Sequence, residues 1–153
     1  MDLILWRHAE AEDDAPQGDD LQRSLTPRGE KQAARMAAWL DRQLPDGVRI
    51  LCSPALRCEQ TVLRLGRKYK IRPELAPGAA PADILGAAQW PRSRQSVLVV
   101  GHQPSLGETI AQLMHLKDAG CPVRKGAIWW FRARERDGAE QAVLVATQSP
   151  DLL

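Results

Sequence analysis

The chain has 153 residues, and its 21 lysine and arginine residues nearly balance 19 acidic ones, leaving a formal net charge of +2. This length fits a single domain over residues 1–153 that can bury a core without disulfides or metal. The charge bias is too small to favour nucleic acid or a membrane surface as a partner, and no apolar run approaches the roughly 20 residues of a membrane span.

The cysteine content and the start of the chain bear on location. Three cysteines, an odd number without metal-ligand spacing, predict reduced thiols in a cytoplasmic protein and no metal site. No secretory signal peptide is expected, because the first apolar run ends at Trp6 and follows Asp2. No cofactor is expected either.

The first elements are a strand, a loop and a helix. Residues 3–6 form a short apolar run typical of a buried strand. Residues 13–22 are acidic, contain proline and glycine, and are predicted to be a loop. A helix is predicted to begin at Thr26-Pro27, where threonine is a good cap and proline suits the first helical position, and to end at 45–47. Its buried stripe is Ala33, Met36, Ala37, Leu40 and Leu44.

The middle of the chain continues this alternation. Residues 48–52 are predicted to form a second strand. A second helix is predicted from the stripe Ala55, Cys58, Val62, Leu65 and Tyr69. The proline-rich residues 71–96 are expected to be irregular, with a short strand near 71–75 and one short helix near 82–89.

The last elements complete the predicted sheet. Residues 97–100 read as a central strand, and a helix after it is predicted from Leu106, Ile110, Leu113 and Met114. Residues 127–133 and 141–147 flank Asp137-Gly138 and are predicted to be a strand pair. The alternation of strands and helices predicts an α/β fold, a three-layer α/β/α sandwich with a mostly parallel sheet.

Polar side chains that suit phosphate chemistry follow the predicted strands. Arg7 and His8 end the first strand, Arg57 follows the second after a short turn, and His102 follows the strand over 97–100. Ligand sites in open α/β sheets lie beyond the carboxyl ends of the strands, so these four side chains are expected to converge. Each alone is more often a surface or core residue. Together they favour a phosphate site with a histidine available as nucleophile.

Four sequence stretches resemble the histidine phosphatase superfamily, the phosphoglycerate-mutase-like group, and within it the small bacterial SixA-type phosphohistidine phosphatases. They are Leu-Trp-Arg-His-Ala-Glu-Ala at 5–11, Arg-Ser-Leu-Thr-Pro-Arg-Gly at 23–29, Ser-Pro-Ala-Leu-Arg-Cys-Glu-Gln-Thr at 53–61 and Val-Gly-His-Gln-Pro at 100–104. The resemblance spans nearly the whole chain. Ala9 stands where the superfamily often has glycine, and we expect the backbone there to accommodate its methyl group.

The resemblance implies roles for the four clustered residues. His8 would be the nucleophile that forms a covalent phosphohistidine, while Arg7, Arg57 and His102 would bind the phosphoryl group. A neutral imidazole attacks from one nitrogen if the other donates to a fixed acceptor, so His8 is expected to donate to a backbone carbonyl. His102, beside the same anion, is expected to be biased towards its charged form.

The proton donor for the leaving group is the least defined role. In relatives it is a carboxylate between the positions of Arg57 and His102, which makes Glu74 the candidate. Glu10, beside the Arg-His pair, is its competitor. Arg23 is a further candidate for phosphate binding, although a surface position fits an arginine there equally well.

The spacing of the site residues bears on the substrate. Arg57 and His102 are only 45 positions apart, which leaves room for one short helix and predicts a shallow, open pocket. Such a pocket suits a phosphorylated side chain on another protein. The resemblance to SixA-type phosphatases implies that this side chain is phosphohistidine, for example on a histidine-containing phosphotransfer domain, so a phosphohistidine phosphatase is the predicted function. A small-molecule phosphomonoesterase of the same superfamily, using the same residues, is the alternative.

Two other classes are less favoured. A cysteine-dependent phosphatase needs five residues between its cysteine and arginine, whereas only four separate Cys52 from Arg57. A non-catalytic phosphopeptide-binding module would keep the arginines but would have no need of His8.

Overall fold

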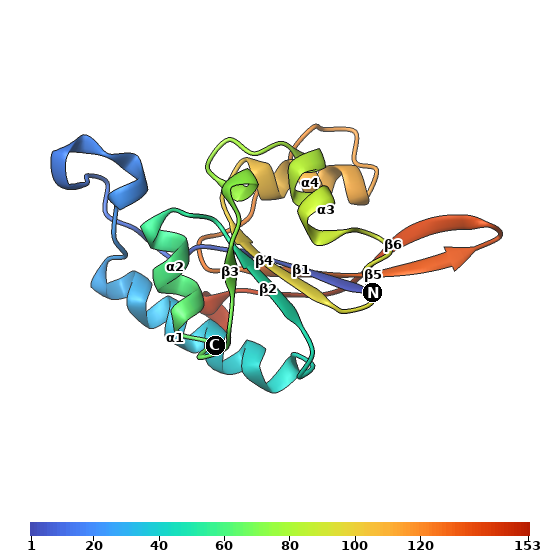
Figure 1. Ribbon diagram of the computed structural model, residues 1–153, viewed down its shortest axis with the longest axis horizontal. Helices are drawn as coiled ribbons and strands as arrows, with labels where there is room; N and C mark the ends of the chain where they lie inside the picture. Colours follow the sequence, from blue (N-terminus) through green and yellow to red (C-terminus); the bar gives the residue numbers. More distant parts are fainter.

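The computed structural model describes residues 1–153 and contains one six-stranded sheet with helices on both faces (Figure 1). Its strands are β1 (Asp2–Arg7), β2 (Arg49–Cys52), β3 (Lys70–Ile71), β4 (Val97–Gly101), β5 (Ile128–Arg136) and β6 (Ala139–Gln148). Its helices are α1 (Pro27–Gln43), α2 (Leu56–Leu63), α3 (Pro81–Ala88) and α4 (Ser105–Leu113). No helix is long and apolar enough to cross a membrane.

The strand order across the sheet is β3-β2-β4-β1-β5-β6. The first four are parallel to their neighbours, whereas β5 runs antiparallel to β1 and β6 antiparallel to β5. This confirms the predicted mostly parallel sheet. Arg7 lies opposite Gly101 in the ladder between β1 and β4, so the residues that follow each strand, His8 and His102, emerge side by side at one edge.

Two apolar cores fill the space between the sheet and its helices, because alternate strand residues face opposite sides. On one face α1 and α2 cover side chains of the central strands and Trp130. On the other face α3 and α4 cover the intervening side chains and Phe131. The buried helical residues of the first core are Met36, Ala37, Leu40, Cys58 and Val62, and those of the second are Ile84, Ala87, Ala88, Leu106, Ile110 and Leu113.

Three predicted elements differ from the structure. The second helix ends at Leu63, before Leu65 and Tyr69, because Gly66 turns the backbone away with a φ of 69°. The strand predicted near 71–75 is only Lys70–Ile71, and a 3-10 turn follows from Pro73, whose ring removes the N–H that a ladder needs. The last strand pair is longer than predicted, and its pairing continues to Arg136 and Ala139 beside the turn.

The predicted loop over 13–22 contains two short 3-10 turns, Pro16–Gly18 and Asp20–Gln22. In Figure 1 this segment projects from the body of the protein beyond α2. Its base is held by an isolated bridge between Ala11 and Leu25. The segment therefore returns to the body of the protein near the carboxyl end of β1, and Asp20 in its second turn contacts Arg57.

Candidate active site

The parallel ladder between β1 and β4 places His8 and His102 next to each other. The backbone N–H of His8 donates to the carbonyl oxygen of Gly101 at 3.1 Å, and the ring centroids of His8 and His102 are 5.3 Å apart. Both side chains are buried, with 7% of His8 and 3% of His102 exposed. The predicted convergence of these two residues is thus present in the structure.

The imidazole of His8 is fixed in one tautomer. Its Nδ1 lies 2.7 Å from the carbonyl oxygen of Ala9, and because a carbonyl only accepts, Nδ1 carries the proton and Nε2 keeps its lone pair. The Ala9 N–H donates to the Thr61 hydroxyl at 3.1 Å, which holds that peptide in place. Burial lowers the pKa of His8 to about 3, against the opposing effect of the Ala9 hydrogen bond. His8 is therefore neutral near pH 7, and its expected backbone partner is confirmed.

His102 has the same Nδ1–H tautomer as His8 but presents the other nitrogen to the site. Its Nε2 lies 2.7 Å from the Ser53 hydroxyl, which itself accepts from the N–H of Ala55 at 3.2 Å. With the hydroxyl proton assigned to the bond with Nε2, Nδ1 carries the imidazole proton and has no hydrogen-bond partner within the protein. His102 therefore offers one N–H donor to a ligand.

The expectation that His102 is biased towards its charged form concerns the site with an anion bound and stays a prediction. In the protein alone, burial and the positive charge of Arg57 together lower the pKa of His102 to about 4, outweighing the attraction of Asp20. An imidazolium in this position would be desolvated next to a guanidinium. His102 is therefore neutral near pH 7 in the protein alone.

The two arginines present donors that the protein does not use. Arg57 lies in the first turn of α2 and is 3% exposed, and its Nη1 donates to the backbone oxygen of Asp20 at 2.8 Å. Arg7 donates from Nη1 to the backbone oxygen of Val123 at 2.7 Å. In both, Nε is buried without a partner in the protein. Because buried donors are normally paired, these atoms mark a candidate anion-binding site.

Arg7 and Arg57 lie close enough to both histidines to affect their protonation. The positive charges of Arg7 and Arg57 lower the pKa of both His8 and His102. The unused Nε–H groups and the His102 Nδ1–H therefore accompany a histidine whose Nε2 is free to act as a nucleophile. This arrangement can bind a phosphoryl group and accept it.

The sequence Ser-Pro-x-x-Arg-x-x-Gln-Thr has a contact for each polar residue. Ser53 orients His102 and Thr61 holds the peptide of Ala9, as described above. Gln60 Oε1 accepts from the backbone N–H of Leu25 at 2.7 Å and so ties the loop before α1 to α2. The motif indicated this region, whereas the individual roles of Ser53 and Thr61 were not predicted, because they depend on contacts across the fold.

Neither candidate proton donor contacts the four clustered residues. Glu74 lies in the turn after β3 and forms an ion pair with Arg72, with Nη2 and Oε1 2.5 Å apart. Glu10 Oε2 accepts from the Thr26 hydroxyl at 2.7 Å, at the start of α1. No hydrogen bond or ion pair joins either carboxylate to His8. A proton-donor role for Glu74 or Glu10 stays a prediction.

Arg23 reaches the site through an acid that sequence reasoning missed. Its Nε donates to Asp20 Oδ1 at 2.9 Å, while Asp20 Oδ2 accepts from Arg57 Nη2 at 3.1 Å. Arg23 is thus one residue removed from Arg57. A direct contact of Arg23 with phosphate stays a prediction.

The cysteines near the site are unsuited to nucleophilic attack. Cys52 is fully buried, and its thiol donates to the backbone oxygen of Ser53. Burial raises the pKa of Cys52 above its usual range and raises that of Cys58 to about 12. Both remain protonated near pH 7, and the thiolate is the nucleophilic form. The geometry disfavours the cysteine-dependent mechanism.

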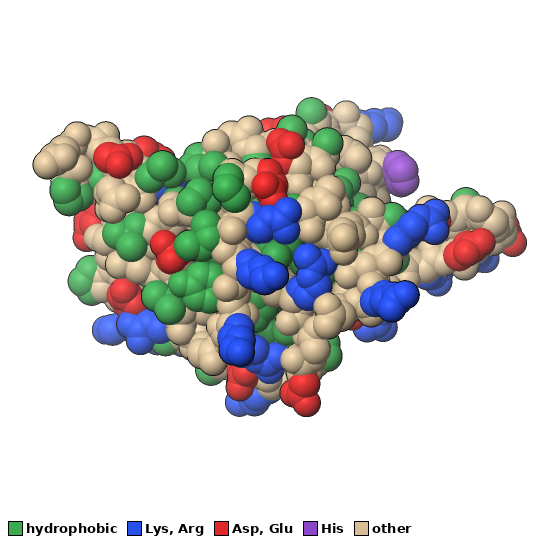
Figure 2. All heavy atoms as spheres, viewed as in Figure 1, with side chains coloured by type: hydrophobic (Ala, Val, Ile, Leu, Met, Phe, Trp, Pro, Cys, Tyr) green, Lys and Arg blue, Asp and Glu red, His purple; other side chains and the backbone are tan.

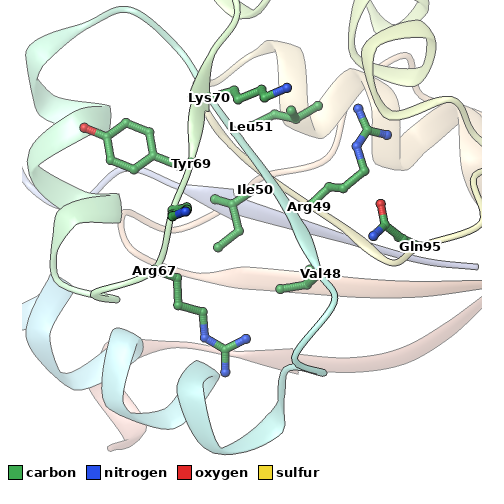
Figure 3. A pocket seen from close by; sticks show the side chains of 9 residues that line it. Val48, Arg49, Ile50, Leu51, Arg67, Tyr69, Lys70 and Gln95 are labelled. Carbon is green, nitrogen blue, oxygen red and sulfur yellow. The ribbon is translucent and has the colours of Figure 1, made fainter.

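A separate cavity of about 620 Å³ opens at the edge formed by β2 and β3 (Figure 3). Lysine and arginine side chains gather over this region of the surface in Figure 2. The cavity is lined by Val48, Arg49, Ile50, Leu51, Arg67, Lys68, Tyr69, Lys70 and Gln95. It shares no residue with the histidine site and is no part of the chemistry described above.

The fold and the site define an α/β protein in which two histidines and two arginines gather at one end of the sheet as a candidate phosphate site. The sequence profile of the histidine phosphatase superfamily (branch 1) matches residues 3–80, and the chain belongs to this superfamily. The phosphohistidine phosphatase SixA of Escherichia coli is 34% identical over 122 residues, covering 74% of each chain. The SixA homologue of Haemophilus influenzae is 29% identical and covers 98% of this chain and 97% of its own.

The solved structures include a close neighbour. The protein histidine phosphatase SixA complexed with tungstate superposes with a TM-score of 0.78 at 28% identity, covering 99% of both chains. The predicted fold and the predicted superfamily are both confirmed.

Proposed function

We propose that the protein hydrolyses phosphohistidine on another protein, and that His8 Nε2 is the nucleophile. The observation that carries this proposal is the buried, neutral His8, fixed by Ala9 with its lone pair towards a site of unused donors. The likeness to SixA phosphatases over most of the chain supports the substrate class. We propose further that residues 1–153 form one domain around the single sheet. We also propose that the protein works in the cytoplasm, since Cys52, Cys58 and Cys121 are free thiols.

In the first step His8 Nε2 attacks phosphorus. The bond between phosphorus and the leaving nitrogen breaks while the bond to Nε2 forms, and the leaving imidazole takes up a proton from solvent water. Arg7, Arg57 and His102 Nδ1–H stabilise the negative charge on the phosphoryl oxygens. Their positions are set before substrate arrives, so little reorganisation is needed during transfer.

In the second step water attacks the phosphohistidine on His8. The new bond to the water oxygen forms as the bond to Nε2 breaks, and inorganic phosphate leaves. The hydrogen bond from Nδ1 to Ala9 keeps the imidazole in the same orientation in both steps. His8 thus returns to the tautomer from which it started.

The nature of the leaving group favours phosphohistidine. An imidazole departs with less proton transfer than an alkoxide requires. No carboxylate contacts His8 in the structure, and Glu74 is paired with Arg72. A histidine-containing phosphotransfer domain is the partner that we propose.

A substrate panel tests the proposed function. We expect phosphohistidine on a phosphotransfer domain to be hydrolysed faster than a phosphoserine peptide or a sugar phosphate at equal concentrations. Glu74→Gln should change phosphohistidine turnover little, as should Glu12→Gln, an exposed acid that serves as control. Preference for sugar phosphates together with a large loss in Glu74→Gln would instead assign a small-molecule phosphomonoesterase with Glu74 as general acid.

A further inference from the structure

Asp20 holds the guanidinium of Arg57 with two different oxygens. Its backbone oxygen accepts from Nη1 at 2.8 Å, and its carboxylate Oδ2 accepts from Nη2 at 3.1 Å. The two residues are 37 positions apart, and Asp20 belongs to the 3-10 turn that ends the projecting segment in Figure 1. The segment is thus joined to the floor of the site through one arginine.

The contact leaves a defined part of Arg57 free. A guanidinium carries five N–H groups, and Asp20 takes one from each terminal nitrogen. The Nε–H is buried without a partner in the protein. A phosphoryl group that binds at Nε and the adjacent terminal nitrogen would form the bidentate pair that arginine favours. Asp20 therefore binds the two terminal nitrogens of the guanidinium and leaves the Nε–H available to a phosphoryl group.

The charge of Asp20 is itself balanced. Its Oδ1 accepts from Arg23 Nε at 2.9 Å, and Arg23 in turn donates from Nη1 to the backbone oxygen of Glu12 at 2.8 Å. The hydrogen bond from Arg23 and the charge of Arg57 lower the pKa of Asp20 below its usual range. The carboxylate is therefore ionised and fixed, even though 58% of its side chain is exposed.

Building on the function proposed above, we propose that Asp20 is a positioning residue that orients Arg57 for the phosphoryl group, with Arg23 holding Asp20 in place. Asp20 acts through Arg57 and does not itself touch the substrate. If Asp20 only competed with phosphate for Arg57, its carboxylate would be expected to pair with the Nε–H of Arg57 as well, and that N–H has no partner in the protein. The same contact makes the orientation of Arg57 depend on the segment that projects from the protein.

The kinetic test uses p-nitrophenyl phosphate, so that it does not depend on the natural substrate. Asp20→Ala should lower kcat roughly 10- to 100-fold, the range expected when a transition-state contact is misplaced, with little rise in KM. Asp14→Asn, which removes an exposed acid of the same segment, should match the wild type. A kcat that is unchanged or raised in Asp20→Ala would show that Asp20 competes with phosphate, and would overturn the proposal.

A double variant tests whether Asp20 acts through Arg57. In an Arg57→Lys background, Asp20→Ala should change kcat less than about twofold, because residues that act as one unit are not additive. A full loss in that background would mean that Asp20 acts independently of Arg57, and would overturn the proposal.

A spectroscopic readout separates this proposal from the proposed function. The ¹H–¹⁵N signal of Arg57 Nε–H should be resolved in the wild type and in Asp14→Asn, and should shift when inorganic phosphate is added. In Asp20→Ala we expect this signal to broaden and its response to phosphate to be lost. An identical signal and response in Asp20→Ala would contradict the positioning role. A normal wild-type response without any phosphatase turnover would instead count against the proposed function alone.

Discussion

At the scale of single residues, the two buried histidines share the Nδ1–H tautomer, but different partners leave different ring nitrogens free. His8 donates from Nδ1 to a carbonyl, whereas His102 accepts at Nε2 from the Ser53 hydroxyl. One ring thereby offers a lone pair to the site and the other offers an N–H. The chemistry that the site supports follows from this difference, because phosphoryl transfer needs both a nucleophile and donors around it.

Removing the Ser53 hydroxyl tests the assignment of His102. Ser53→Ala leaves Nε2 with only the Cys58 thiol, at 3.5 Å, as a weak partner, so the imidazole is freer to change tautomer. We expect kcat/KM to fall by about tenfold, equivalent to the 1–2 kcal/mol of a lost buried hydrogen bond. Ser105→Ala serves as the matched control, since its buried hydroxyl has no partner. Equal activity in the two variants would contradict the role of Ser53.

At the scale of elements, α2 connects the parts of the site. Its first turn carries Arg57, and its last turn places Thr61 against Ala9 and Gln60 against Leu25. The helix has only eight residues, so these contacts span its whole length. The start of α1 approaches the same region closely, because Gly29 packs on the backbone of Glu10.

The close approach at Gly29 makes a prediction for stability. A methyl group there would lie 2.0 Å from the backbone oxygen of Glu10, so the chain must shift to admit it. Gly29→Ala should lower the free energy of unfolding by about 1–3 kcal/mol, the usual cost of overpacking. Gly47→Ala is the control, because nothing lies within 4 Å of the added carbon. Urea unfolding of both variants measures the difference, and equal midpoints would refute the tight packing at Gly29.

The elements show what the sequence could predict. Apolar periodicity and capping residues were enough to locate α1, because Thr26 caps it and Pro27 begins it. The end of α2 was missed, since Leu65 and Tyr69 continue an apolar spacing beyond the turn at Gly66. Arg7, His8, Arg57 and His102 could be found because each lies at or shortly after the carboxyl end of a strand. Asp20 could not, because its contact with Arg57 depends on how a loop without apolar periodicity folds back.

At the scale of the whole molecule, the buried histidines make stability depend on pH. The folded-state pKa of His8 is lowered to about 3 and that of His102 to about 4, both below the ordinary value. Between roughly pH 6.5 and pH 4 the unfolded chain therefore binds protons that the folded protein does not. Stability should be fully present above pH 6.5 and should fall as the pH is lowered.

Urea unfolding at pH 7 and pH 5 measures this effect. We expect each histidine to account for about 2 kcal/mol of the loss between these values, given about 1.4 kcal/mol per pKa unit. The variant His8→Gln/His102→Gln should lose less stability than the wild type over this interval. Asp2 and Asp20, whose pKa values are lowered by arginine partners, act at still lower pH. An equal pH dependence in both proteins would contradict neutral, buried histidines.

The central claim is that His8 carries the phosphoryl group during turnover. The most direct measurement starts the reaction with a phosphorylated phosphotransfer domain as substrate and stops it with alkali, which preserves phosphohistidine. The modified peptide is then mapped by mass spectrometry. We predict phosphate on His8 in the wild type, and neither label nor turnover in His8→Gln, whose rate should fall by roughly three orders of magnitude or more. A phosphoryl group on Cys52 or Cys58, or undiminished turnover in His8→Gln, would contradict the account.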